Sequence, residues 1–174
     1  MKKLNYASLS IIGIIVLVAA LRVAQVFPPN FAPVTALCLL GSAYFSRKWM
    51  AFIIPTAVLA LSDIFIGGGK ELISVYFAYA LIILLGFALN NNVKPLRVLA
   101  TSLGASVLFY VVTNFFCWYG SPYYTQDLSG FTTNYVGALP YFRTSLVSDL
   151  GYSALFFTAF EQVRVRFPQF STAK

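Results

Sequence analysis

Long apolar runs, separated by short polar or turn-forming segments, dominate the sequence. The six runs cover approximately residues 5–27, 33–46, 49–66, 72–89, 96–119 and 141–161. The breaks between them combine proline, glycine, asparagine or charge, which favour turns and end helices, as in Pro28-Pro29-Asn30, Ser46-Arg47-Lys48, Gly67–Glu71 and Asn90–Pro95. A helix needs about 20 apolar residues to cross a bilayer. The pattern therefore predicts an all-α fold, a single membrane domain of about six transmembrane helices over residues 1–174.

Two stretches depart from this regular pattern. The run 33–46 is short for a full span, so we expect a tilted or re-entrant segment, or one extended by residues 30–32. Residues 120–140 are rich in Tyr, Thr, Ser and Gly, and we expect them to form an outer loop that does not span the membrane. The sequence leaves open whether this loop closes over a site as a lid or lies on the membrane interface.

Composition and charge support a lipid environment and set an orientation. Hydrophobic residues make up 59% of the chain and charged residues 10%, against roughly 45–50% and 25% in soluble domains. If the N-terminus is inside, the cytoplasmic segments hold nine of the twelve basic residues: Lys2, Lys3, Arg47, Lys48, Lys94, Arg97, Arg164, Arg166 and Lys174. Lys and Arg in short loops favour the cytoplasm. We expect a multi-pass protein of the bacterial inner membrane with both ends inside, and no nucleic-acid partner.

Signals of enzyme chemistry are absent from the sequence. It contains no histidine, HExxH, GxSxG or P-loop, so we expect neither an enzyme nor a metal or cofactor site. Cys38 and Cys117 lie in apolar runs without CxxC spacing, which favours two small buried side chains over a disulfide or a ligand pair.

Four ionisable residues lie within or near the ends of predicted spans, where charges are costly and therefore candidates for function. They are Arg22, Asp63, Arg143 and Asp149, and the predicted topology places all four toward the outer side. One interpretation is structural, with the two acids and two bases neutralising each other as buried pairs. The other is a polar, outward-facing pocket for a small-molecule substrate. Its further lining candidates are Gln25, Asn30, Asn114, Trp118, Tyr119, Tyr123, Tyr124 and Asn134.

Two small residues at helical spacing, Ala20 and Ala24, provide a smooth face on which another helix could pack closely. Arg22 lies between them in sequence, but a helix turns it about 200° away from Ala20. The alanines and the arginine can therefore face different neighbours.

Several segments resemble a family of small uncharacterised bacterial membrane proteins described as transport proteins. They are Asn30-Phe31-Ala32-Pro33-Val34-Thr35-Ala36-Leu37, Gly41-Ser42-Ala43-Tyr44-Phe45, Leu61-Ser62-Asp63, Thr113-Asn114-Phe115 with Trp118, Ala138-Leu139-Pro140 and Ser148-Asp149-Leu150. The architecture also resembles the substrate-binding S-components of energy-coupling factor vitamin transporters. That resemblance implies docking of Ala20 and Ala24 on a membrane scaffold subunit coupled to ATPases. It implies a binding subunit for uptake of a vitamin or small metabolite. The alternative is a non-transporting membrane scaffold whose buried charges are structural.

Overall fold

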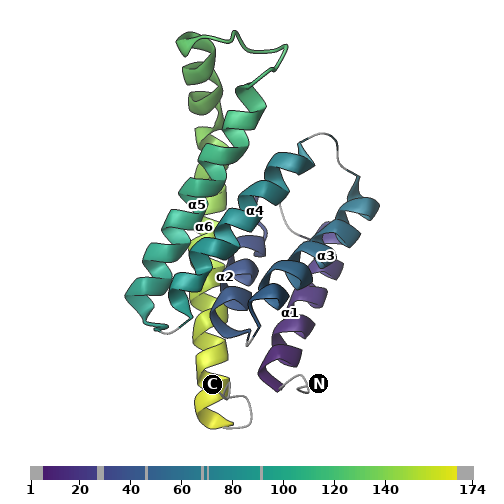
Figure 1. Cartoon of the computed structure of the whole chain (residues 1–174), viewed down its shortest axis with the longest axis vertical. Helices are drawn as coiled ribbons and strands as arrows, with labels where there is room; N and C mark the ends of the chain where they lie inside the picture. Colours follow the sequence, from purple (N-terminus) through teal and green to yellow (C-terminus); the bar gives the residue numbers. More distant parts are fainter. Residues whose placement is uncertain are drawn as a thin grey trace.

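The chain is all-helical in a computed structural model, which describes residues 6–26, 30–45, 47–67, 69, 71–90 and 92–167 (Figure 1). These residues form six α-helices and one 3-10 turn, and no strand. The elements are α1 (Tyr6–Val23), α2 (Val34–Tyr44), α3 (Lys48–Ile66), α4 (Leu72–Gly86), η1 (Phe87–Leu89), α5 (Pro95–Trp118) and α6 (Leu128–Arg166). The predicted helical fold is confirmed, and each predicted span overlaps one α-helix.

Three of the helical segments are long and apolar enough to cross a membrane: α3, α4 continued through η1, and α5. Their outward faces carry exposed apolar side chains such as Ile64, Phe65 and Ile73, which lipid accepts and water does not. These features indicate a membrane protein. The apolar part of α1 and all of α2 are shorter than a span, so the number of six crossings stays a prediction.

Helix α2 lies at the centre of the bundle, and all of its 11 residues are buried. At 1.5 Å per residue it is about 16 Å long, roughly half of the ~30 Å hydrocarbon layer. Small residues let it pack closely: a Cβ at Gly86 of α4 would lie 2.7 Å from that of Ser42, whose hydroxyl donates to Ile83 O at 3.0 Å. Residues 30–32 are not helical. The predicted short run is therefore a buried half-length helix, and the extension through 30–32 was wrong.

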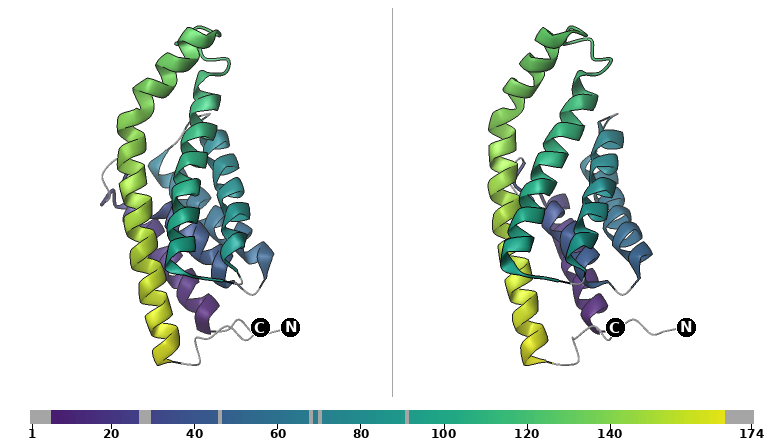
Figure 2. Two further views of the ribbon diagram at one scale, coloured as in Figure 1. Left: turned by 90° about the vertical axis from the view of Figure 1, so that its left-hand side faces the viewer. Right: turned by 60° about the vertical axis from the view of Figure 1, so that its left-hand side comes forward.

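Helices α5 and α6 form a long hairpin that projects beyond the other helices (Figures 1 and 2). Helix α6 has 39 residues and is about 58 Å long, which exceeds the thickness of a bilayer. The predicted loop at 120–140 was wrong beyond residue 127, because α6 begins at Leu128 and not near residue 141. Asp127 caps this start by accepting a hydrogen bond from the Gly130 N–H at 2.8 Å, and Pro140 lies within the helix.

Aromatic packing explains why residues 128–140 are helical despite their loop-like composition. Tyr135 packs on Tyr110 of α5 with ring centroids 5.5 Å apart, and the Tyr110 hydroxyl donates to Tyr135 O at 2.5 Å. Phe131 packs on Trp118 at 5.3 Å. Contacts of this kind between helices outweigh a weak intrinsic helix preference.

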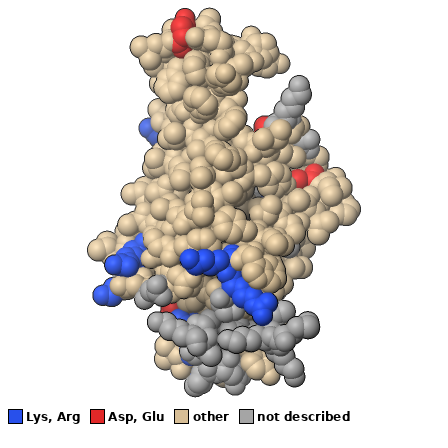
Figure 3. Space-filling view, in the orientation of Figure 1, with Lys and Arg blue, Asp and Glu red and all other residues tan. Residues whose placement is uncertain are grey.

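Basic residues gather at one end of the bundle, where α3 and α5 begin and α6 ends (Figure 3). Lys48 lies over the Phe87 ring at 5.4 Å, and Arg164 lies over the Tyr44 ring at 5.1 Å. Glu71 and Asp127 lie at helix starts of the opposite end. The predicted orientation requires this separation of charge, and the assignment of the basic end to the cytoplasm stays a prediction.

Candidate functional site

Arg22 and Asp63 form an ion pair that joins α1 to α3. Arg22 Nη2 lies 2.9 Å from Asp63 Oδ1, and Arg22 Nη1 donates to Ser62 Oγ at 2.8 Å. The other carboxylate oxygen accepts a hydrogen bond from Tyr76 of α4 at 2.5 Å. Each charged group therefore has its partner within the protein, which is the arrangement of a structural contact between three helices.

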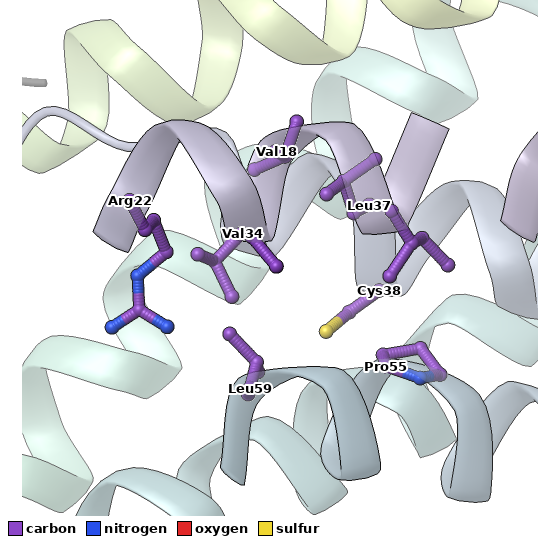
Figure 4. Close-up of a pocket in the computed structure, with 9 residues that line it drawn as sticks. Val18, Arg22, Val34, Leu37, Cys38, Pro55 and Leu59 are labelled. Atoms are coloured by element: carbon purple, nitrogen blue, oxygen red, sulfur yellow. The ribbon is translucent and has the colours of Figure 1, made fainter. Parts of the chain in front are cut away.

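The space beside this pair is too small for a metabolite. Arg22, Val34, Cys38, Pro55 and Leu59 are among the residues around a void of about 10 Å³, close to the volume needed by one water molecule (Figure 4). In Figure 4 the Cys38 sulfur points into the gap between α2 and α3. The predicted substrate-binding role of Arg22 and Asp63 gains no support from this geometry.

A larger cavity of about 320 Å³ lies between α5, α6 and the connection from α1 to α2. Asn30, Ser106, Phe109, Tyr110, Thr113, Asn114, Ala138, Tyr141, Phe142 and Ser145 line it. A second cavity of about 90 Å³ shares Asn30, Phe109 and Ser145 with the first and also contacts Ala32, Thr35, Tyr79 and Asp149. The shared residues make the two spaces neighbours. We call them together the α5–α6 cavity, with an aromatic part (320 Å³) and an Asp149 part (90 Å³).

Asp149 lies among small hydroxyl side chains of α5 and α6 and is only 4% exposed. Its carboxylate accepts a hydrogen bond from Ser106 Oγ at 2.7 Å, and its backbone carbonyl accepts one from Ser102 at 3.1 Å. Ser102 also bonds Ser153 at 3.0 Å. Across the part of the chain that the structure describes, the salt bridges are Arg22–Asp63 and Arg164–Glu161, so Asp149 has no basic partner there.

The half-length helix α2 begins at the Asp149 part of the cavity. Thr35, in its first turn, lines this part together with Asp149. No side chain caps the start of α2. The unpaired N–H groups of a helix start carry a partial positive charge, so this end of α2 favours the negative charge of Asp149.

Asn30 reaches the cavity because the connection between α1 and α2 is fixed to α6. Its φ of 58° is in the left-handed region, which asparagine tolerates better than most residues. Ser145 Oγ donates to Asn30 O, and Ser148 Oγ donates to Ala32 O, both at 3.3 Å. The two hydroxyls lie on the turn of α6 that carries Asp149.

The tip of the hairpin is held by hydrogen bonds between its own residues. Trp118 Nε1 donates to Thr125 O at 2.9 Å, and Gln126 Nε2 donates to Trp118 O at 2.9 Å. Tyr119 is 66% exposed, and Tyr123 is 89% exposed. Trp118 therefore braces the hairpin, Tyr119 is exposed, and neither lines the cavity. Residues 128–140 belong to a helix and not to a lid-forming loop.

Three predicted substrate-binding residues, Asn30, Asn114 and Asp149, lie at the α5–α6 cavity. The predicted neutralisation in pairs is confirmed for Arg22 and Asp63, whereas Arg143 is exposed and does not pair with Asp149. Asn134 is buried and donates to Asn114 O at 2.9 Å, so it braces α6 against α5. Gln25 is exposed and is not among the cavity residues.

The sequence reasoning missed the hydroxyl residues of the site. Ser102 and Ser106 repeat at a spacing of four on α5, as do Ser145 and Asp149 on α6. Small polar residues at helical spacing in apolar helices mark faces where helices approach and exchange hydrogen bonds. That spacing was the available signal.

The remaining predictions concern the cysteines, metals and partner docking. Cys38 is buried, as expected, whereas Cys117 is exposed, so its predicted burial was wrong. The described residues contain no group of three or more His, Cys, Asp or Glu side chains able to hold a metal ion. Ala20 and Ala24 are both exposed, while Arg22 turns toward α3. Their docking role stays a prediction.

Comparison with known proteins places the chain in a family without assigning it an activity. No curated protein and no solved structure matches it. A family model matches residues 2–170, which is nearly the whole chain. The chain therefore belongs to the family of unknown function DUF6580.

Proposed function

We propose that this chain is a small-molecule-binding subunit of an uptake transporter, with the α5–α6 cavity as its ligand site. The observation that carries the proposal is an aromatic-lined cavity of about 320 Å³ that adjoins a smaller cavity of about 90 Å³ at a buried carboxylate. This volume is at the lower end of the range for small-ligand sites, about 300–1,000 Å³. Such a site has room for a vitamin fragment or a similar metabolite.

The arrangement of the chain supports capture from one side of a membrane. The cavity lies between the helices of the projecting hairpin. The basic end of the bundle lies away from the hairpin tip (Figures 1 and 3). If the basic end faces the cytoplasm of the inner membrane, the hairpin tip faces outward. The exposed Ala20 and Ala24 provide a separate surface for a scaffold subunit that would drive release inside.

Binding can be tested with the purified full-length chain in a neutral detergent, by thermal shift across a panel of vitamins and small metabolites. Replacing Ala138, which lines the cavity, by tryptophan should fill the site and abolish any shift. The matched control is Val136→Trp, at an exposed position two residues away on the same helix. The proposal fails if no compound shifts the wild type, or if both variants bind equally well.

A second candidate function, a membrane scaffold with structural charges, is favoured by the fully partnered Arg22–Asp63 contact. It predicts that the chain binds no small ligand and that a partner subunit copurifies with it. Loss of that partner on truncation of the hairpin, with no ligand shift in the wild type, would support the scaffold over the binding subunit.

A further inference from the structure

We infer that the ligand of the α5–α6 cavity is a small organic cation, an ammonium or a similar group attached to an apolar or aromatic body. Its charged end lies at Asp149 and its body in the aromatic part. This inference rests on the proposed function and adds the chemical class of the ligand.

The first argument is the sign of the charge around the cavity. Asp149 is the only Asp, Glu, Lys or Arg among the described residues that line either part of it. The two arginines predicted to lie at the same level are placed elsewhere, since Arg22 binds Asp63 and Arg143 is exposed. An anionic ligand would meet a carboxylate and no basic side chain, which disfavours anions strongly.

The start of α2 favours an anion. Its partial charge is roughly +0.5, half of the full negative charge of Asp149. Asp149 already lies at this end of the helix, so its negative charge offsets that partial positive charge. The sum at the Asp149 part of the cavity stays negative, and a cation is the ligand that compensates it.

The second argument is the neutral character of the groups that contact Asp149. Its carboxylate bonds the Ser106 hydroxyl, and Thr35 lines the same part of the cavity. Hydroxyl groups satisfy lone pairs but supply no positive charge. A buried carboxylate without a basic partner is costly at membrane depth, and such groups mark ion or substrate sites. A cationic ligand group would lower that cost by pairing with Asp149.

The third argument is the aromatic lining next to the carboxylate. Tyr79 and Phe109 lie at the Asp149 part, with ring centroids 5.2 Å apart. Tyr110 and Phe142 lie at the aromatic part, 4.7 Å apart. Aromatic faces attract cations, especially away from water, and also accept a flat or apolar body by contact. The lining thus favours both parts of the inferred ligand.

Three probes of one shape and different charge test the inference. Benzyltrimethylammonium is cationic, neopentylbenzene is its neutral isostere, and phenylmethanesulfonate is an anion with a similar tetrahedral head. Binding to the purified full-length chain would be measured by thermal shift and calorimetry in a neutral detergent. We expect the ammonium to bind at least about tenfold more tightly than the neutral probe, and the sulfonate not to bind.

The variant Asp149→Asn keeps the shape of the side chain and removes its charge. It should weaken the ammonium by at least about tenfold and leave the neutral probe nearly unchanged. Its fold would be checked by circular dichroism and gel filtration. Because the charge series on the wild type needs no variant, that series decides the inference even if Asp149→Asn misfolds.

Equal binding of the ammonium and neutral probes, or binding of the sulfonate, would overturn the inference. It would also fall if the metabolite panel yields a neutral or anionic ligand that Ala138→Trp excludes, and in that case the proposed function stands. If no probe and no metabolite binds the wild type, both the proposed function and the inference fail.

Discussion

Removing the negative charge of Asp63 should destabilise the bundle without affecting ligand binding. In the variant Asp63→Asn, the Arg22 guanidinium loses its ion-pair partner at 2.9 Å, and Tyr76 donates to a neutral oxygen in place of a charged one. Breaking a buried pair by removing one member costs about 3–5 kcal/mol. The side chains of Arg22 and Asp63 are 22% and 9% exposed, so we expect the lower bound, about 3 kcal/mol.

A double-mutant cycle separates the pair from its surroundings. Arg22→Met alone should also cost about 3 kcal/mol, because it leaves the Asp63 carboxylate buried without its cation. The double variant Arg22→Met with Asp63→Asn should be more stable than either single variant, since no unpaired charge remains. Arg143→Met is the matched control at an exposed arginine and should change stability by less than about 0.5 kcal/mol.

The free energy of unfolding would be measured by SDS titration in mixed dodecyl maltoside micelles, followed by circular dichroism. Ligand binding would be measured on the same samples. The structural interpretation of the pair is refuted if Asp63→Asn unfolds like the wild type, or if it abolishes binding while stability is unchanged. Either result would favour a role of Asp63 in ligand binding over a structural role.

Three further predictions test the packing of α2, the start of α6 and the docking surface. Gly86→Ala should cost about 1–3 kcal/mol by overpacking, because its Cβ would lie 2.7 Å from that of Ser42, whereas Gly104→Ala meets only an ordinary contact at 3.6 Å and should be neutral in the same SDS titration. The backbone N–H of Gly130 donates a hydrogen bond to the Asp127 carboxylate and holds the pKa of Asp127 below its usual value. This hydrogen bond therefore stabilises the fold at pH values above the unfolded-state pKa of Asp127, and the stabilisation is lost as the pH falls through the folded-state pKa. The hydrogen-exchange protection factors in the first turn of α6 should therefore fall below about pH 4 in the wild type, and Asp127→Ala should show low protection at all pH values. Ala20→Trp should leave ligand binding to the purified chain intact and abolish uptake of that ligand in cells. Unchanged uptake would rule out docking of a scaffold subunit on the face that carries Ala20.

The sequence predicted the helices that are long, apolar and bounded by strong breaks. The expected runs 49–66, 72–89 and 96–119 agree with α3, α4 with η1, and α5 within about a residue at each end. Glycine, asparagine and proline between them leave little freedom in where a helix ends. The same reasoning was wrong at 120–140, because the stability of that part of α6 comes from rings on α5, and no property of residues 128–140 alone reveals those partners.

The candidate site could be predicted only in part, because depth along a helix does not specify which helices are neighbours. Arg22 and Asp63 were correctly assigned to one level and are a pair, but Arg143 and Asp149 on the same helix face different surroundings. Asp149 meets Ser106 because α5 and α6 pack along their length. Pairwise contacts of this kind depend on the whole arrangement of helices. In the sequence they are indicated only weakly, by small polar residues spaced four apart.

The short length of α2 connects the fold to the proposed site. A central helix of full length would continue through the space now bordered by Tyr79, Phe109 and Asp149, and its side chains would fill it. Helix α2 instead begins at Val34, and the chain before it turns aside through Asn30 and is fixed to α6 by Ser145. A helix of this length would leave about 14 Å of a hydrocarbon layer of about 30 Å to the surrounding helices. The cavity, the helix end that faces it and the buried carboxylate are thus consequences of one feature, a helix that stops halfway, and the sequence shows it as an apolar run too short to span.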